Sequence, residues 1–212
     1  MTLLRKWLIL AHRYLGIPLS MVFVVWFVSG IVMMYAGGMP QVTPQLRLNR
    51  LPALDIYRGN LTPRDAAKHA KVWSPADSVS LFMVTDRPAY RLGTTTVFAD
   101  NGEVLGNIGA AEAQTVASKF TGHPEEKIQH VGTLQQPDQW TMTYDHLMPL
   151  YKFRVDDGLG TELYVSSSAV EVTVITTQRS RALAWIGAIP HWFYFSAVTS
   201  QSFAVVQGCH LD

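Results

Sequence analysis

An uncharged apolar run near the start of the chain is the feature that most limits how this sequence can fold. It extends from Leu15 to Ala36 and holds no charged residue. As a helix this run is about 33 Å long, enough to cross a bilayer hydrocarbon core of about 30 Å. The apolar core of a secretory signal is shorter, about 7–15 residues. We therefore predict a retained transmembrane helix, with residues 1–37 forming a cytoplasmic N-terminus and this helix.

Basic residues lie on only one side of the apolar run. Arg5, Lys6 and Arg13 precede it, and the next basic residue is Arg47. The positive-inside rule then places the N-terminus in the cytoplasm and the main polar region outside it. Gly16 and Ser20 are spaced as a small-residue face for helix packing, the alternative being a lone anchor with incidental small residues. Membrane lipid is thus an expected partner, and other transmembrane helices or a homodimer are further candidates.

Composition argues against several classes of function. The net charge is +1 and no basic patch is interleaved with aromatic residues, so we expect no nucleic-acid partner. The only cysteine is Cys209, which excludes an intrachain disulfide, a CxxC metal site and a CxxCH haem-attachment site. Ser166–Ser168 lack a GxSxG elbow, and Asp156 and Asp157 lack calcium-loop spacing, so a hydrolase or a calcium site is not expected.

After the apolar run the chain becomes polar, and one pattern occurs twice. Residues 38–60 show no clear period and are predicted to be an extended linker or a leading strand. Residues 61–107 begin with a helix signalled by Thr62 as N-cap and Pro63 at the first helical position, and continue with strands that end in a D-N-G-E hairpin turn.

The second copy, residues 108–177, begins with an Ala-rich helix that ends at Gly122. Five strands are predicted to follow, at residues 127–134, 139–147, 149–157, 160–168 and 170–177. The two copies align at the segments "RPAYRL" and "MPLYKF", and again where Glu103-Val104 matches Glu171-Val172. The predicted fold class is therefore a membrane-anchored α+β protein with two repeats of a helix followed by antiparallel strands.

These segments resemble the PepSY-associated transmembrane family. The likeness lies in "HRYLG" opening a membrane helix that carries "SG", in "RPAYR" with its D-N-G-E-V turn, and in "ELYVSSSAVEV" followed by "RALAWIGAIPHWFYF". It covers residues 5 to 195 and implies a bacterial inner-membrane protein with periplasmic PepSY repeats. The resemblance further implies a link to iron uptake, because some members are haem-containing reductases of ferric siderophores.

Two departures from the family pattern affect the expectations. Val170 stands where the turn of the second repeat usually has glycine, so we expect a distorted hairpin there. After Phe195 the sequence no longer resembles the family, whose members continue into further membrane helices, and we expect a truncated or frame-shifted product. Residues 178–212 are predicted to be an aromatic membrane-proximal segment at the outer interface, a complete second span over residues 182–207 being the alternative.

Two of the seven histidines are candidate ligands. His12 and His191 each lie where the chain meets the membrane and match family positions, whereas His69, His123, His130 and His146 are expected to be structural or solvated. Neutral imidazole is a good axial ligand for haem iron, and an ionisable group at membrane depth is costly enough to indicate function. Since most of a bilayer separates the two positions, they would serve different irons, and each would need a partner histidine from another helix. His210 is given no role.

Two functions follow from these observations. The first is a part in a haem-dependent electron-transfer system, with haem b held at His12 and His191 and ferric siderophore iron as the substrate. The alternative is a membrane-anchored extracytoplasmic binding module that regulates or inhibits a peptidase, which the two nearly whole repeats favour.

Overall fold

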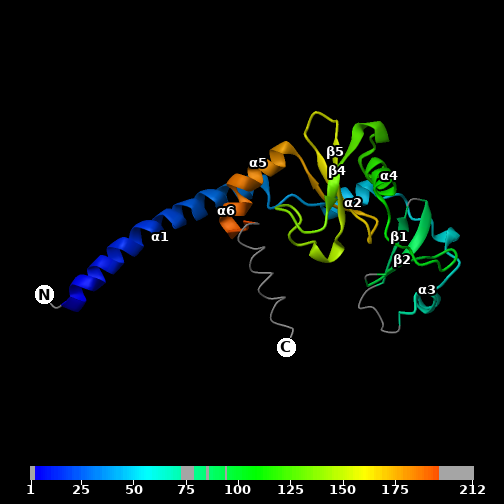
Figure 1. Ribbon diagram of the computed structural model, residues 1–212, viewed down its shortest axis with the longest axis horizontal. Coiled ribbons are helices and arrows are strands. Elements are labelled where there is room, and N and C mark those ends of the chain that lie inside the picture. Colours follow the sequence, from blue (N-terminus) through cyan, green and yellow to red (C-terminus); the bar gives the residue numbers. More distant parts are fainter. Residues whose placement is uncertain (1–2, 73–78, 85, 94, 196–212) are drawn as a thin grey trace. The chain divides into compact units, whose positions relative to one another are not determined.

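The computed structural model describes residues 3–72, 79–84, 86–93 and 95–195, and its elements are labelled in Figure 1. The chain divides into two compact units. We call Met1–Pro40 with Gln178–Asp212 the helical unit, and Gln41–Thr177 the sheet unit. The residues on either side of the polar region therefore belong together.

The helical unit is built on α1 (Leu3–Ala36), a single helix of 34 residues. Within the described residues it is the one helix long and apolar enough to cross a membrane, which fits a membrane anchor or a signal sequence. Pro18 is tolerated inside it, and Ser29 is the residue of α1 that is buried. Gly16 has nothing within 4 Å of an added Cβ, so no described part of the chain packs closely on the predicted small-residue face at that position.

Two short helices, α5 (Gln178–Ile186) and α6 (Ala188–Trp192), pack against α1. Gly187 separates them, at a point where an added Cβ would lie 3.1 Å from Val32 Cγ1 and 3.0 Å from the Leu183 carbonyl oxygen. The lack of a side chain at Gly187 thus lets the chain turn closely against α1.

The described part of the predicted segment 178–212 holds no helix of spanning length. The helices α5 and α6 have 9 and 5 residues, against about 20 for a membrane span. Residues 196–212 lie outside the described part, and with them the second half of the span predicted as the alternative over residues 182–207.

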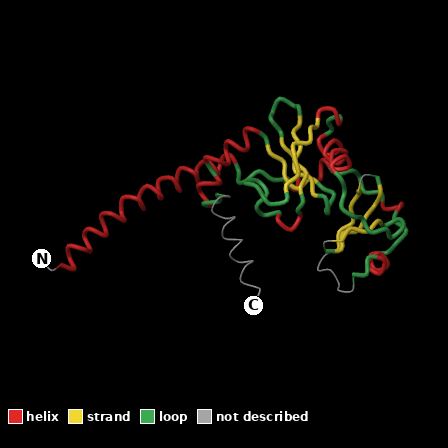
Figure 2. The backbone as a smooth tube through the Cα atoms, viewed as in Figure 1, coloured by secondary structure: helices red, strands yellow, loops and turns green. Residues whose placement is uncertain are grey.

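The sheet unit contains two antiparallel sheets, whose strands are yellow in Figure 2. The first sheet has the order β1-β2-β3, formed by Val79–Val84, Arg87–Leu92 and Thr95–Phe98. Helix α3 (Pro63–His69) packs against it through Ala66, which meets Leu92 and Val97. The predicted start of α3 is confirmed, because the Thr62 hydroxyl accepts a hydrogen bond from the Asp65 backbone N–H.

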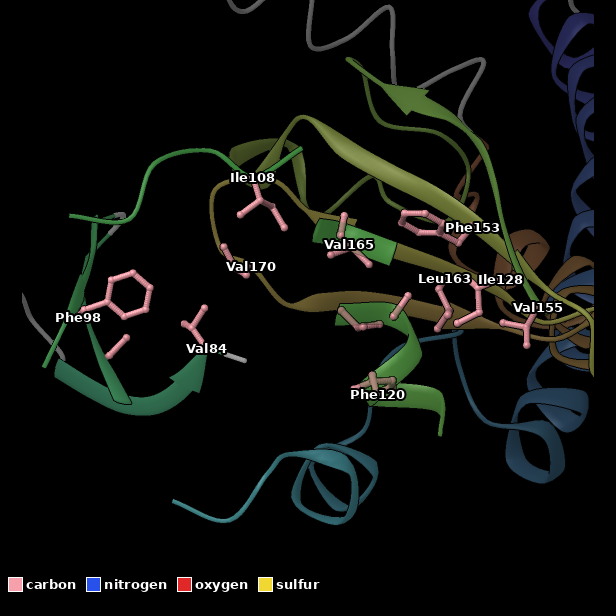
Figure 3. Close-up of a cluster of buried hydrophobic side chains, with 14 residues drawn as sticks. Val84, Phe98, Ile108, Phe120, Ile128, Phe153, Val155, Leu163, Val165 and Val170 are labelled. Atoms are coloured by element: carbon pink, nitrogen blue, oxygen red, sulfur yellow. The ribbon is translucent and has the colours of Figure 1, made fainter. Parts of the chain in front are cut away.

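The second sheet has the order β4-β5-β6-β7, formed by Ile128–Leu134, Leu150–Val155, Glu162–Ser166 and Val172–Thr176. Helix α4 (Ala110–Thr121) covers one face of it and ends at Gly122, as predicted. Figure 3 shows that the main core continues from this sheet to the first one, through Val84 and Phe98. The predicted α+β class, with a long N-terminal helix and small antiparallel sheets with helices, is therefore confirmed.

The predicted strand at residues 139–147 is wrong. This segment forms turns and the short 3-10 helix η3 (Asp145–Leu147), and its apolar residues cover the second face of the four-stranded sheet, around Tyr164. The reason is Asp138, whose carboxylate accepts hydrogen bonds from the Trp140 backbone N–H and from the hydroxyls of Thr141 and Tyr164. Side-chain bonds of this kind offer the backbone a turn in place of a strand.

The predicted extended stretch at residues 38–60 is wrong in part. It contains α2 (Pro44–Arg50) and the 3-10 helix η1 (Ile56–Arg58). Thr43 caps α2 by accepting a hydrogen bond from the Leu46 backbone N–H, and Pro44 occupies the first turn. The same Thr-Pro pair signalled α3, so the sequence did contain the cue for α2.

The turns before Glu103 and Glu171 have matching backbone hydrogen bonds. Gly102 N–H donates to the Phe98 carbonyl at 2.9 Å, and Val170 N–H donates to the Ser166 carbonyl at 3.0 Å. Gly102 has φ +77° and Val170 has φ +52°, so both turns require the left-handed conformation that glycine favours. A distortion is expected in the second hairpin, and its strands β6 and β7 show a register shift between Tyr164 and Val165.

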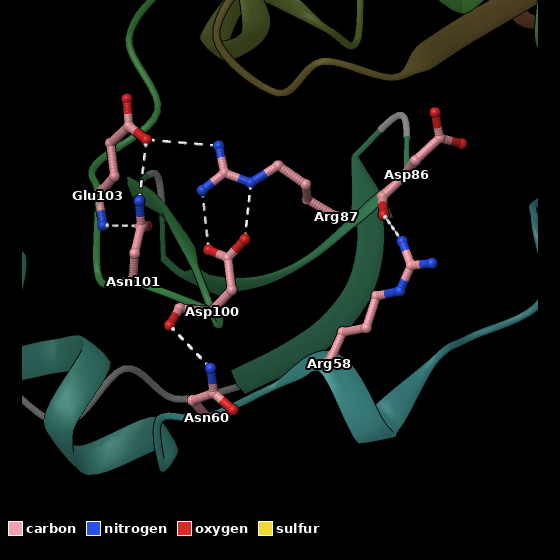
Figure 4. Close-up of polar contacts among 7 residues, drawn as sticks. All are labelled: Arg58, Asn60, Asp86, Arg87, Asp100, Asn101 and Glu103. Carbon is pink, nitrogen blue, oxygen red and sulfur yellow. Dashed lines mark hydrogen bonds and ion pairs between the residues drawn. The ribbon is translucent and has the colours of Figure 1, made fainter.

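Polar contacts hold the first of these turns to the neighbouring strand (Figure 4). The Arg87 guanidinium binds both carboxylate oxygens of Asp100, at 2.7 and 2.8 Å, and lies 3.7 Å above the Phe98 ring. Hydrogen bonding from Arg87 lowers the pKa of the Asp100 carboxyl below its ordinary value, although partial burial opposes the shift. The same pairing raises the pKa of Arg87.

We expect Gly102→Ala to destabilise the sheet unit by about 2 kcal/mol, against about 1 kcal/mol for Gly158→Ala. Both glycines have positive φ, but an added Cβ at Gly102 would lie 2.7 Å from Cγ of His69, whereas the one at Gly158 meets nothing within 4 Å. Urea unfolding of the full chain in detergent, followed by circular dichroism, measures both costs. Adding His69→Ala to Gly102→Ala should remove the difference, and equal costs for the two single variants would contradict this account.

We expect Asp100→Asn to lower stability by about 1 kcal/mol at neutral pH, and this effect to disappear as the pH falls through the depressed folded-state pKa of the Asp100 carboxyl. The folded-state pKa of Asp100 is depressed, so its contribution is present above the unfolded value of about 3.9 and is lost as the pH falls through the folded value. Denaturant unfolding at several pH values measures it. Asp86→Asn is the control, because the Asp86 side chain is 78% exposed and solvent screens its contact with Lys119. A difference that is independent of pH would show that the Asp100 charge is not the cause.

Candidate functional site

His191 lies in α6 and contacts one turn of α1. Its Nδ1 is 3.0 Å from the Trp26 carbonyl oxygen and 3.3 Å from the Ser29 hydroxyl. Its ring stacks on the Trp26 indole, with the ring centres 4.8 Å apart and the planes 13° from parallel. Two segments that are far apart in the sequence thus combine into one histidine site within the helical unit.

The hydrogen bonds determine which ring nitrogen of His191 carries the proton. A carbonyl oxygen can only accept, so the nitrogen 3.0 Å from the Trp26 oxygen is the donor. The Ser29 hydroxyl donates to the same carbonyl at 3.0 Å and is a second acceptor for the Nδ1 proton. In the neutral ring, Nε2 therefore keeps its lone pair. Metal-binding histidines in proteins are commonly held in this way, by a hydrogen bond from the other nitrogen to a carbonyl.

Gly30 provides the space for the imidazole. An added Cβ at Gly30 would lie 3.0 Å from Cε1 of His191, which is closer than an unshifted ring would tolerate. The contact also lies within the uncharged run, because Ser29 precedes Ala36 by seven residues, or about 10 Å of helix. A polar ring at that level needs partners, and the Trp26 carbonyl and Ser29 supply them.

The second predicted ligand, His12, is not brought to this site. It is an exposed residue of α1, 17 positions before Ser29. At 1.5 Å per residue the two positions are about 25 Å apart along the helix. The expectation that His12 and His191 cannot share one iron therefore agrees with the geometry.

The other described histidines lie in the sheet unit. His69 ends α3, His123 lies in the turn after α4, and His130 packs in β4 against Tyr151 and Phe153. His146 lies in η3 and not on a strand, with its side chain 64% exposed. Among the described residues, no group of three or more His, Cys, Asp or Glu side chains is placed to hold a metal ion. His210 falls outside the described part of the chain.

The residues considered for hydrolysis or calcium binding have structural contacts. The hydroxyl of Ser166 donates to the Leu147 carbonyl, and that of Ser167 donates to the Ile108 carbonyl. Burial raises the pKa of Asp157, but hydrogen bonds from Thr161 and the Leu159 backbone outweigh it and leave the pKa below its ordinary value. These contacts stabilise turns and strand ends.

The residues that α1 contributes to the histidine site were not predicted from the sequence. Ser29 and Gly30 follow Trp26 by 3 and 4 residues, so both lie beside it on one face of a helix. That spacing was visible in the sequence, but nothing in it showed that His191 would return to this face.

No family model, curated protein or solved structure matches this chain. The PepSY resemblance therefore rests on the segments quoted from the sequence.

We expect Gly30→Val to displace the His191 ring, because the Cβ of valine would lie 3.0 Å from Cε1 and its methyl groups would add further bulk there. NMR of isotope-labelled histidine in the full chain should show a proton on Nδ1 of His191 in the wild type and a changed signal in the variant. Gly16→Val is the matched control on the same helix and should leave the signal unchanged, because nothing lies within 4 Å of that position. A proton on Nε2 in the wild type would contradict the assignment.

Proposed function

We propose that this chain is a bacterial inner-membrane protein that belongs to a haem-dependent electron-transfer system reducing ferric siderophore iron. In this proposal α1 spans the membrane with its N-terminus in the cytoplasm, and the sheet unit is periplasmic. The observation that carries the proposal is the hydrogen bond from His191 Nδ1 to the Trp26 carbonyl.

The first support is the fit of His191 to one axial position of a haem. Its ring is oriented by a carbonyl that accepts from Nδ1, so the neutral form presents an Nε2 lone pair, the arrangement that iron ligation uses. Trp26 stacks on one face of the ring and restricts its rotation. When bound, haem b would supply one-electron transfer, and the residues of this chain would hold and orient a single ligand.

The second axial ligand has to come from elsewhere, because His12 is about 25 Å away along α1. A helix of another protein or a second copy of this chain could supply it. His12 would then belong to a second haem near the cytoplasmic end of α1, again completed by a partner. The fit for His12 is weaker, because it is exposed along α1.

The helical unit also supports a retained anchor over a cleaved signal. The helices α5 and α6 pack on α1, and three glycines mark the close approaches, namely Gly30 to His191, Gly187 to Val32 and Gly38 to Trp192. Removal of α1 would leave these faces without their partner. The basic residues Arg5, Lys6 and Arg13 support the cytoplasmic placement of the N-terminus.

The alternative is a membrane-anchored binding module that regulates or inhibits a peptidase outside the cytoplasm. It is favoured by the self-contained sheet unit, in which α4 and both sheets share a core from Val84 to Val172. In this alternative the contact between His191 and Trp26 only fastens the chain to its anchor.

We expect the full chain, purified from haem-replete bacterial membranes with its associated proteins, to show a b-type reduced-minus-oxidised spectrum. His191→Ala should remove the signal that depends on this site, because the other described histidine of the helical unit, His12, is about 25 Å away along α1. The haem content per chain distinguishes the partners, since a site shared by two copies would hold one haem for every two chains.

His146→Ala is the control, because it removes an exposed histidine from the sheet unit. The control variant should retain the spectrum of the wild type. A wild-type protein without haem, or a spectrum insensitive to His191→Ala, would overturn the proposal for this site and favour the binding module.

A further inference from the structure

A cleft in the sheet unit is not used by the proposed electron-transfer function. It has a volume of about 520 Å³ and is lined by parts of α2, β1, β2, α4 and β7 and by the turn before β7. This volume lies within the range of about 300–1,000 Å³ typical of small-molecule sites. We call it the sheet-unit cleft.

One part of the lining of the sheet-unit cleft is apolar. It is formed by side chains from β1, from α4, from the turn before β7 and from the start of β7, namely Phe82, Met83, Val116, Phe120, Val170 and Val172. In Figure 3, Phe120 lies on α4, and Val170 lies between Val84 of the first sheet and Val165 of the second; both belong to the shared core. An apolar ligand body could therefore replace water against these side chains with a favourable free energy.

The other part of the lining is cationic. Arg47, Arg50, Arg91 and Lys119 line the cleft with only two carboxylates, Asp86 and Glu171, so the described lining has a net charge of +2. A cleft with this balance attracts anions and disfavours cations.

Existing ion pairs in the cleft show where a further carboxylate could bind. Glu171 is held between Arg47, at 2.7 Å, and Arg91, at 3.2 Å, and both guanidiniums are engaged by it. Arg50 is different, because its guanidinium donates to the Thr121 carbonyl at 2.8 Å, a neutral acceptor. Since a carbonyl leaves the charge of Arg50 uncompensated, this residue is the strongest candidate to bind an incoming anion.

We propose that the sheet-unit cleft binds a small amphiphilic carboxylate, with its apolar body against Phe82, Met83 and Phe120 and its carboxylate at Arg50. The proposal does not depend on haem binding at His191, because the cleft is formed within the sheet unit alone. It adds a ligand-binding role to either of the two proposed functions.

Two probes of equal shape test this proposal. The full chain in lipid nanodiscs is titrated with para-trifluoromethylbenzoate and with the neutral para-trifluoromethylbenzamide, and binding is followed by fluorine NMR against empty nanodiscs. We expect the benzoate to bind about fivefold more tightly than the amide, because a charge-assisted hydrogen bond to arginine is stronger than a neutral one.

Three variants make the test specific to the cleft. Arg50→Gln should weaken benzoate binding to the level of the amide, whereas Arg64→Gln, which removes the same charge from the exposed face of α3, should leave it unchanged. Met83→Trp should weaken both probes by filling the apolar part, with circular dichroism showing that the fold is kept. Equal binding of the two probes, or equal losses for Arg50→Gln and Arg64→Gln, would overturn the proposal.

Discussion

Most of the apolar surface of α1 has no cover within the described part of the chain, and the rest of the helical unit is arranged around this constraint. Ser29 is the residue of α1 that is buried, while large side chains such as Trp7, Phe23 and Phe27 are more than half exposed. Such a surface is costly in water but is stable in a hydrocarbon phase of matching length. The helices α5 and α6 cover only a short stretch of α1, and at that stretch the polar ring of His191 finds the Trp26 carbonyl and the Ser29 hydroxyl.

In the sheet unit the constraint is different, because each of its two sheets is too small to enclose a hydrophobic core alone. Helix α4 buries Ala113, Ala117 and Phe120 against the four-stranded sheet, and the same core extends to Val84 and Phe98 of the three-stranded sheet. A second link is electrostatic, because Glu171 from the turn before β7 pairs with Arg91 of β2. The two helix-and-sheet segments thus form one body, and the cleft lies where they meet.

The proposed histidine site and the sheet-unit cleft rely on different physical effects. The histidine site depends on the direction of a hydrogen bond, since the bond from Nδ1 of His191 to a backbone carbonyl selects the tautomer and leaves Nε2 available. The cleft depends on an excess of positive charge beside apolar side chains, which selects a class of ligand without requiring one geometry.

Local signals in the sequence determined much of the fold. The uncharged run from Leu15 to Ala36 specified α1, the Thr62-Pro63 pair specified the start of α3, and Gly122 specified the end of α4. Each signal acts through the backbone of its own segment or through transfer of side chains from water, so it can be recognised without knowing the neighbours.

Tertiary structure decided the rest. Asp138 turned the predicted strand at 139–147 into a cover for the sheet through its bond to Tyr164, and His191 returned to Trp26 across 165 residues of sequence. Such contacts depend on where distant segments meet, and no local pattern of residues specifies that meeting point.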